Sequence, residues 1–137
     1  MTVPESVRRF VAERAGHRCE YCLLHERDSY TPHQVDHILS QKHAGSSDPE
    51  NLAWACIRCN AWKGSDISSI NPETGEIVAL FHPRRHRWID HFELRGHTVE
   101  PITPIGKVTG RLLRLNSDQR VAERRSLPDS PHTPFRK

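Results

Sequence analysis

The fold is decided by two short stretches, Cys-Glu-Tyr-Cys at residues 19–22 and Cys-Ile-Arg-Cys at residues 56–59, which contain all 4 cysteines of the chain. In each stretch two residues separate the cysteines, a spacing typical of zinc-binding turns. Four thiolates complete the tetrahedral shell of one Zn²⁺ ion. The spacing therefore predicts a structural zinc site. Its ligands are Cys19, Cys22, Cys56 and Cys59.

Disulfide bonds and a thioredoxin-like redox site are the alternative uses of these cysteines. The N-terminus enters an amphipathic pattern without a signal-peptide core, so we expect a cytoplasmic protein in a reducing compartment, where disulfides are disfavoured. A βαβ pattern, which a thioredoxin-like motif requires, surrounds neither pair. Residues 23–55 exceed the roughly 15–20 residues usual between the pairs of a zinc ribbon. We therefore expect an inserted segment between the two cysteine pairs that bind the zinc.

The size and charge of the chain indicate a single globular domain without a membrane partner. With 137 residues the chain is about one domain long, and its composition is that of a globular protein. The apolar runs are shorter than the ~20 residues that cross a bilayer, so we expect no membrane partner. The net charge is +3. Nucleic-acid affinity would thus come from local groups, such as Arg84, Arg85 and Arg87 or the basic residues of 111–137.

Local patterns predict the elements of the first half. Residues 3–15 place Val3, Val7, Phe10 and Val11 on one helical face, with Thr2 and Glu5 at capping-box spacing and Gly16 as the stop. Strands are predicted at 34–39 and 51–55, separated by a loop at 42–50. The second cysteine turn begins a helix at residues 60–63.

The second half is predicted to continue the α+β pattern. Expected are a strand at 77–81, a helix at 83–92 with Trp88 and Phe92 facing the core, a strand at 97–102, a helix from Thr103-Pro104 to Asn116, and a helix at 117–125. We therefore predict three parts: residues 1–95 as the main domain, residues 96–127 as a C-terminal strand and helices that pack on it, and residues 128–137 as a flexible tail.

Four polar residues stand between the cysteine pairs or directly after them: Asp36, His37, Asn51 and Asn60. Each alone has an ordinary explanation, a surface pair for Asp36 and His37 or a cap for either asparagine. Together they gain weight because the zinc would clamp both ends of the segment that carries them. A carboxylate, an imidazole and an amide oxygen would then meet in one small cleft.

The order of these residues resembles a known family. The motifs are Cys19-x-x-Cys22, Val35-Asp36-His37-Ile38-Leu39, Gly45, Asn51-Leu52 and Cys56-x-x-Cys59-Asn60-x-x-Lys63-Gly64. Over residues 6–65 they resemble the HNH endonucleases of the zinc-containing ββα-metal type. A weaker similarity, Leu80-Phe81-His82-Pro83-Arg84 with Trp88-x-x-His91-Phe92, resembles an extension in some bacterial members and bears on domain organisation only.

The resemblance implies a catalytic role for each polar residue. His37 would be the general base that deprotonates the attacking water, a task that suits an imidazole with a reference pKa of about 6.5. Asp36 and Asn60 would bind a divalent ion, and these oxygen ligands favour Mg²⁺ or Mn²⁺. Asn51 would hydrogen-bond within the loop and orient the imidazole. In an extended segment Asp36 and His37 point apart, so we expect a bulge or bend there.

Further residues receive two interpretations. His82 is a candidate metal ligand or phosphate contact, with a surface or packing role as the alternative. Phosphate contacts or a solvated charged face are the two roles for the basic residues Arg58, Lys63, Arg84, Arg85 and Arg87. Trp54 and Trp62 would pack around the zinc or stack on bases.

The prediction is a metal-dependent endonuclease that hydrolyses phosphodiester bonds of DNA, most readily double-stranded. One alternative is a non-catalytic, zinc-ribbon-like module that binds nucleic acid; such a module needs the cysteines but not Asp36, His37 and Asn60. A nuclease toxin separated from a larger context is a further alternative. Biological role, sequence specificity, nicking against double-strand cutting, and oligomeric state stay open.

Overall fold

The computed structural model describes residues 3–127. The predicted tail at residues 128–137 therefore lies outside the described residues, as does Thr2. The chain divides into two compact units, unit 1 ending at Asp66 and unit 2 beginning at Ile67. Helices and small antiparallel sheets make up both units, which confirms the predicted α+β class. Among the described helices, none is long and apolar enough to cross a membrane.

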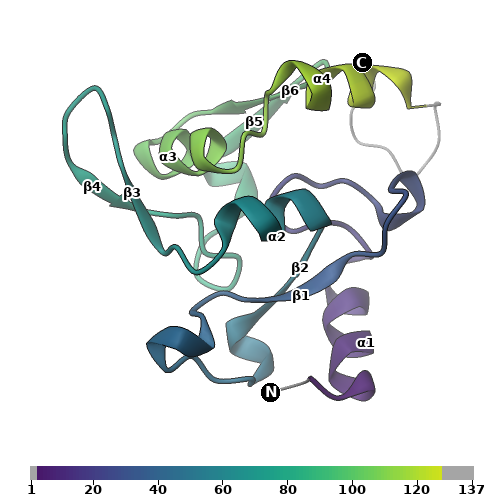
Figure 1. The fold of residues 1–137 in the computed structure, drawn as a ribbon. Coiled ribbons are helices and arrows are strands. Elements are labelled where there is room, and N and C mark those ends of the chain that lie inside the picture. The colour runs from purple at the N-terminus through teal and green to yellow at the C-terminus, as the bar shows by residue number, and fades with distance from the viewer. Residues whose placement is uncertain (1–2, 128–137) are drawn as a thin grey trace. The chain divides into compact units, whose positions relative to one another are not determined.

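Unit 1 is a strand hairpin with two helices (Figure 1). Strands β1 (Gln34–His37) and β2 (Leu52–Ala55) pair antiparallel, with Asp36 opposite Ala53 and His37 opposite Leu52. Helix α1 (Glu5–Arg14) packs against β2, and α2 (Ile57–Lys63) packs against β1. This is the predicted ββα core with an N-terminal helix.

The core of unit 1 lies between α1 and the hairpin. Val11 and Leu52 are fully buried, Trp54 is 3% exposed, and Val7 and Val35 pack against them. Two details predicted for the helix are wrong. Its N-cap is Pro4, with no side-chain capping bond. Phe10 is 51% exposed, because it lies a quarter turn from the stripe that Val7 and Val11 form.

In its described residues, 67–127, unit 2 contains two strand hairpins and two α-helices. The hairpins are β3 (Ser68–Ile70) with β4 (Ile77–Ala79), and β5 (Phe92–Arg95) with β6 (Thr98–Pro101). Helix α3 (Pro104–Leu112) is capped by Thr103, and α4 (Asp118–Ser126) by Ser117. Both helices begin at the predicted places, but α3 ends at Leu112 and not at the predicted Asn116. Phe81, Phe92, Val99, Val108 and Leu113 are buried.

The helix predicted at residues 83–92 is wrong. A turn follows Pro83, a short 3₁₀ turn covers Trp88–Asp90, and β5 begins at Phe92. Gly96 has a φ of 60°, a left-handed conformation that lets the chain reverse and pair residues 92–95 with β6. Phe92 still reaches the core, where its ring contacts Phe81 edge to face at 5.7 Å.

Candidate functional site

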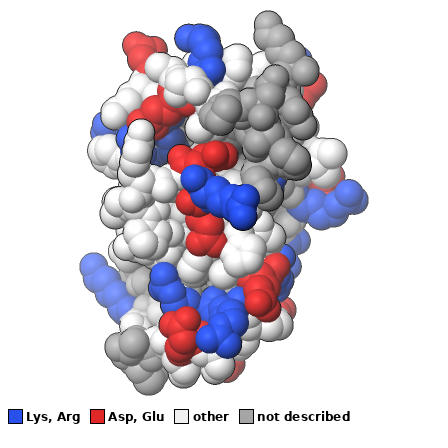
Figure 2. Space-filling model, turned by 90° about the vertical axis from the view of Figure 1, so that its right-hand side faces the viewer, with Lys and Arg blue, Asp and Glu red and all other residues white. Residues whose placement is uncertain are grey.

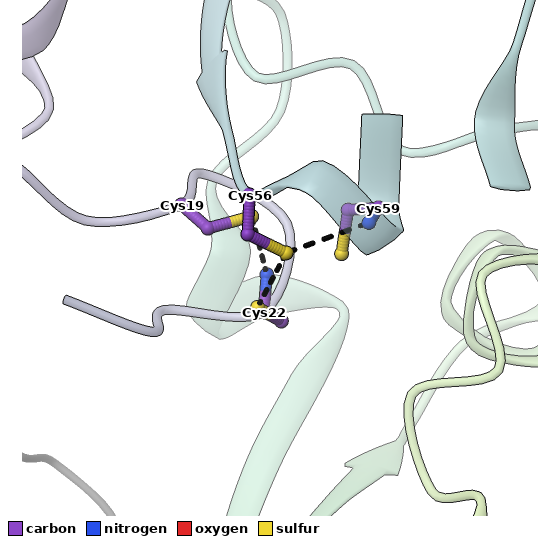
Figure 3. A group of neighbouring side chains, drawn as sticks. All are labelled: Cys19, Cys22, Cys56 and Cys59. Atoms are coloured by element: carbon purple, nitrogen blue, oxygen red, sulfur yellow. Dashed lines mark hydrogen bonds between the residues drawn. The ribbon is translucent and has the colours of Figure 1, made fainter. Parts of the chain in front are cut away.

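The four cysteines form one cluster at the start of α2. Cys19 and Cys22 come from the first turn, Cys56 is the N-cap of α2, and Cys59 lies in its first turn. Figure 3 shows the four side chains directed toward one another. Their sulfur atoms lie within 4.8 Å of one another, and all four residues are buried. Among residues 3–127, no other group of three or more His, Cys, Asp or Glu side chains is close enough to share an ion.

This cluster fits a tetrahedral zinc ion. The Sγ atoms of Cys22 and Cys56 are 3.7 Å apart, close to the roughly 3.8 Å expected when four sulfurs surround zinc at about 2.3 Å. The backbone N–H of Cys22 donates to the Cys19 sulfur, and that of Cys59 donates to the Cys56 sulfur. Burial raises the pKa of the Cys19 and Cys59 thiols well above the ordinary value. Buried thiolates therefore require a cation, which a zinc ion would supply.

The hairpin register places Asp36 and His37 on opposite faces. Four consecutive residues of β1 pair with four consecutive residues of β2, so the predicted bulge is wrong for this segment. His37 lies opposite Leu52 on the α1 side, whereas Asp36 lies opposite Ala53 on the α2 side. The alternation of a regular strand thus holds up to the end of β1.

Asp36 sits in a buried polar network between β1 and α2. Its side chain is 3% exposed, and Lys63 Nζ lies 3.4 Å from each of its carboxylate oxygens. The Tyr21 hydroxyl donates to Oδ2 over 2.7 Å. Burial raises the pKa of Asp36, while Lys63 and Tyr21 oppose that shift. Asp36 is therefore already held by a cation and a hydroxyl.

Lys63 is a buried residue and not an exposed phosphate contact. It is 2% exposed, and Nζ donates to the carbonyl oxygens of Ile38 at 3.0 Å and His37 at 3.4 Å. These bonds and the ion pair with Asp36 use its three donor hydrogens. The solvated role for Lys63 is accordingly wrong as well. Its ammonium joins the end of β1 to α2.

Asn60 lies on the same side of the hairpin as Asp36. Its Nδ2 donates to Gln34 Oε1 over 2.6 Å, and residues 34 and 36 share one face of β1. That bond leaves the carbonyl oxygen Oδ1 as the side chain's available metal-binding atom. Asn60 thus offers an amide oxygen, a type of ligand that Mg²⁺ prefers, whereas Lys63 contacts both carboxylate oxygens of Asp36. The predicted meeting of both side chains with His37 in one cleft is wrong for this structure, because His37 lies on the opposite face of β1.

Asn51 closes the loop that leads away from His37. Its Oδ1 accepts the backbone N–H of Leu39, and its Nδ2 donates to the carbonyls of Leu39 and Ser46 over 2.9 and 2.7 Å. The next residue, Ser47, contacts His37 Nε2 through its hydroxyl at 3.0 Å. The predicted bonding of Asn51 within the loop is confirmed. Its influence on the imidazole would pass through Ser47.

A close backbone approach at Gly45 completes the loop. A Cβ atom at this position would lie 1.6 Å from the Leu39 carbonyl oxygen and 2.8 Å from that of Ser40. The Gly45 N–H donates to the Ser40 carbonyl over 2.9 Å. Any side chain would therefore push apart the strand end and the loop that carries Ser47.

The remaining candidates take different places. Nδ1 of His82 accepts the backbone N–H groups of Arg84 and Arg85, so the ring caps a local turn. Trp54 is buried in the core of unit 1, and Trp62 is 42% exposed on α2. The exposed arginines of this region are Arg85 and Arg87.

Three contributors were not predicted: Tyr21, Gln34 and Ser47. Tyr21 carried a usable signal, because an aromatic hydroxyl inside a buried zinc turn needs a hydrogen-bond partner. Gln34 and Ser47 carried no such sequence signal. The role of Gln34 depends on the packing of β1 against α2, and that of Ser47 depends on the loop folding back onto His37.

One comparison with known proteins finds a match. Residues 19–66 match the family model described as HNH endonuclease. This segment holds both cysteine turns, β1, β2 and α2, so the resemblance to that family is confirmed there. No curated protein and no solved structure matches the chain.

Proposed function

We propose that the HNH endonuclease domain at residues 19–66 hydrolyses phosphodiester bonds of double-stranded DNA with His37 as the general base. The observation that carries the proposal is the arrangement around His37 within the matched segment. A loop closed by Asn51 and by the tight approach at Gly45 brings Ser47 against one ring nitrogen. Such support is what a base requires to hold its orientation during proton transfer.

The Ser47 hydroxyl can either accept from Nε2–H of His37 or donate to Nε2. The proposed mechanism uses the first arrangement, in which Nε2–H donates and Nδ1 carries the lone pair. In hydrolysis Nδ1 takes a proton from water, the water oxygen bonds to phosphorus, and the bond from phosphorus to the leaving oxygen breaks. The leaving oxygen takes up a proton from solvent.

Asp36 and Asn60 are the proposed ligands of a divalent ion, Mg²⁺ or Mn²⁺. Such an ion would neutralise charge on the phosphate and the leaving oxygen. Because Asp36 and His37 lie on opposite faces of β1, action of both on one phosphate also requires the end of β1 to bend. In the structure the Asp36 carboxylate is paired with Lys63. Ligation by Asp36 therefore requires the Lys63 ammonium to withdraw from it, which its flexible four-carbon stem permits. The four cysteines would hold a structural zinc ion, which would fix α2, and with it Asn60, against the hairpin.

The proposal is tested by nicking of supercoiled plasmid with Mg²⁺ or Mn²⁺. We expect wild type to cut and His37→Ala to lose at least about 100-fold in rate, the usual contribution of a general base. His43→Ala is the matched control, because His43 is an exposed histidine of the same loop. Zinc content shows that the variants fold. Equal cutting by wild type and His37→Ala contradicts the proposal.

A second function, a zinc module that binds nucleic acid without cutting it, is favoured by one observation. Asp36 is buried and already neutralised by Lys63, which suits a structural carboxylate as well as a metal ligand. Binding of duplex DNA by wild type without cutting in either metal would support this function instead.

A further inference from the structure

Helix α3 of unit 2 carries basic side chains along one exposed face. Lys107, Arg111 and Arg114 are exposed, and their spacing of four and three residues places them in one row. Arg114 continues the row just past the end of the helix. Thr109 on the opposite face is buried, as are Gly106 and Val108 on the flanks of the helix. We call these three residues the basic row.

The charge of this segment has one sign. From Pro101 to Ser117 the sequence contains no Asp or Glu. Elsewhere acidic and basic side chains are mixed, as on the face of the molecule shown in Figure 2. Lys107 does contact Glu73, at 3.4 Å, but the two side chains are 53% and 71% exposed. An ion pair so open to water is weak and is readily exchanged for another anion.

The basic row borders a hollow of about 450 Å³, within the range of ligand sites. Gly110 lies in its wall between the basic side chains, and an added Cβ there would meet no atom within 4 Å. Asn116 and Ser117 add polar groups at the end of the row. The hollow is therefore open and lined by cations, and none of its described lining residues carries a carboxylate.

Arg114 stands in a costly backbone conformation. Its φ is 52°, in the left-handed region that glycine or asparagine usually fills after a helix. The bond from Leu115 N–H to the Gly110 carbonyl, 3.0 Å, closes the helix end in this geometry. His17, Leu23 and Ala44 share a positive φ, so this conformation alone assigns no function. Arg114 contributes to the row because it lines the same hollow as Lys107 and Arg111.

We propose that the basic row of α3 binds the phosphodiester backbone of double-stranded DNA. Guanidinium and ammonium groups are the usual partners of DNA phosphates, and arginine can contact two phosphate oxygens at once. Lys107 and Arg111 are separated by about 6 Å along the helix axis, so they can contact separate phosphates. Such contacts position a duplex without reading its sequence. The inference rests on the proposed action of the chain on DNA.

Binding of a short duplex by the full zinc-loaded chain tests the inference, with His37→Ala as the background so that the duplex is not cut. Fluorescence anisotropy over a salt series compares this protein with the triple variant Lys107→Gln, Arg111→Gln and Arg114→Gln. We expect binding about tenfold weaker or more, and a salt slope of log K reduced by about 2–3, because each lost phosphate contact removes about 0.9.

The matched control has the same loss of charge at exposed arginines elsewhere: Arg9→Gln, Arg27→Gln and Arg95→Gln. Equal weakening by both triple variants overturns the inference, since it would reflect net charge alone. Inorganic phosphate at constant ionic strength gives a second criterion. Full displacement of DNA by millimolar phosphate would show that the row is a site for small anions, and would contradict the inference that it binds duplex DNA.

Arg114→Gly keeps the backbone geometry and removes the cation. We expect its melting temperature to be unchanged or higher while DNA binding weakens, a pairing that a merely structural arginine would not give. Unchanged binding by this variant and by the triple variant overturns the inference. Nicking separates it from the proposed function. If His37→Ala stops cutting and the triple variant, made in the wild-type background, cuts normally, the basic-row inference is contradicted and the nuclease proposal stands. If the row binds DNA but wild type never cuts it, the nuclease proposal is contradicted and the basic-row inference stands.

Discussion

At the scale of single residues, the buried ion pair of Asp36 and Lys63 joins β1 to α2 at the candidate site of unit 1. Both side chains are at least 97% buried, and the ammonium also binds the carbonyls at the end of β1. A buried ion pair contributes little net stability compared with an apolar pair, but losing one partner leaves an uncompensated charge. The network of Asp36, Lys63 and Tyr21 is therefore sensitive to single substitutions.

Lys63→Met should lower the free energy of unfolding by about 3–5 kcal/mol, because Asp36 then stays buried without its cation. Adding Asp36→Asn should recover part of that loss by removing the charge. Urea unfolding of the two single variants and the double variant measures the coupling. Additive losses would mean that the two side chains do not interact in solution.

The loop beside His37 depends on Gly45 in the same way. Gly45→Ala would place a methyl group 1.6 Å from the Leu39 carbonyl oxygen, so the loop must move and Ser47 with it. We expect about 1–3 kcal/mol of destabilisation and at least a tenfold loss of nicking.

Gly110→Ala is the stability control for an added methyl group. It has open space around it in α3 and should gain roughly 0.5–1 kcal/mol, as alanine does over glycine in a helix. Thermal melting compares the two variants, and plasmid nicking compares Gly45→Ala with wild type. Full activity in Gly45→Ala would show that the loop does not orient His37.

At the scale of elements, the turn at residues 82–86 depends on the protonation of His86. Its Nδ1 accepts the His82 backbone N–H over 2.9 Å. Burial lowers the pKa of His86 below 6.5, and the neighbouring His91 and Arg85 lower it further. A pKa lowered by folding means that the unfolded chain binds the proton more readily. Stability is thus present above pH 6.5 and is lost as the pH falls through the lowered pKa.

We expect the urea midpoint of unit 2 to decrease when the pH is lowered from 7 to 5. In His86→Asn the fall should be smaller, because the amide oxygen can replace Nδ1 as an acceptor and does not titrate. Chemical denaturation over this pH range makes the comparison. Identical pH profiles for wild type and variant would show that His86 does not control this loss.

Elements with local signals were predictable from the sequence, and those set by tertiary pairing were not. Thr103-Pro104 and Ser117 mark the starts of α3 and α4, since a cap acts within four residues of its position. The cysteine spacing likewise led to the zinc cluster. Residues 92–95 form a strand only because β6 lies beside them. Lys63 looked like a surface cation, since its burial depends on Asp36 and on carbonyls distant in sequence.

At the scale of the whole molecule, the two units differ in what holds them together. Unit 1 has a short hairpin, small helices and the cysteine cluster, whereas unit 2 has two hairpins and a core of residues such as Phe81, Phe92 and Leu113. A small hydrophobic core gives only marginal stability unless a cross-link such as a bound metal ion adds to it. Zinc binding in small domains contributes on the order of 10 kcal/mol to folding. Removal of zinc should therefore unfold unit 1 selectively.

Hydrogen exchange resolves this prediction by segment in the full chain. With a strong chelator, or in Cys56→Ser, amides of α1, β1, β2 and α2 should lose their protection, while those of β5, β6, α3 and α4 keep it. Asn60 and Asp36 would then separate, and nicking should stop even when Mg²⁺ is present. Ser126→Ala serves as the control, because it removes a hydroxyl in α4 and leaves every zinc ligand in place. Protection of β1 and β2 that survives complete loss of zinc would mean that the hairpin core, Val11 with Leu52 and Trp54, holds unit 1 without the metal.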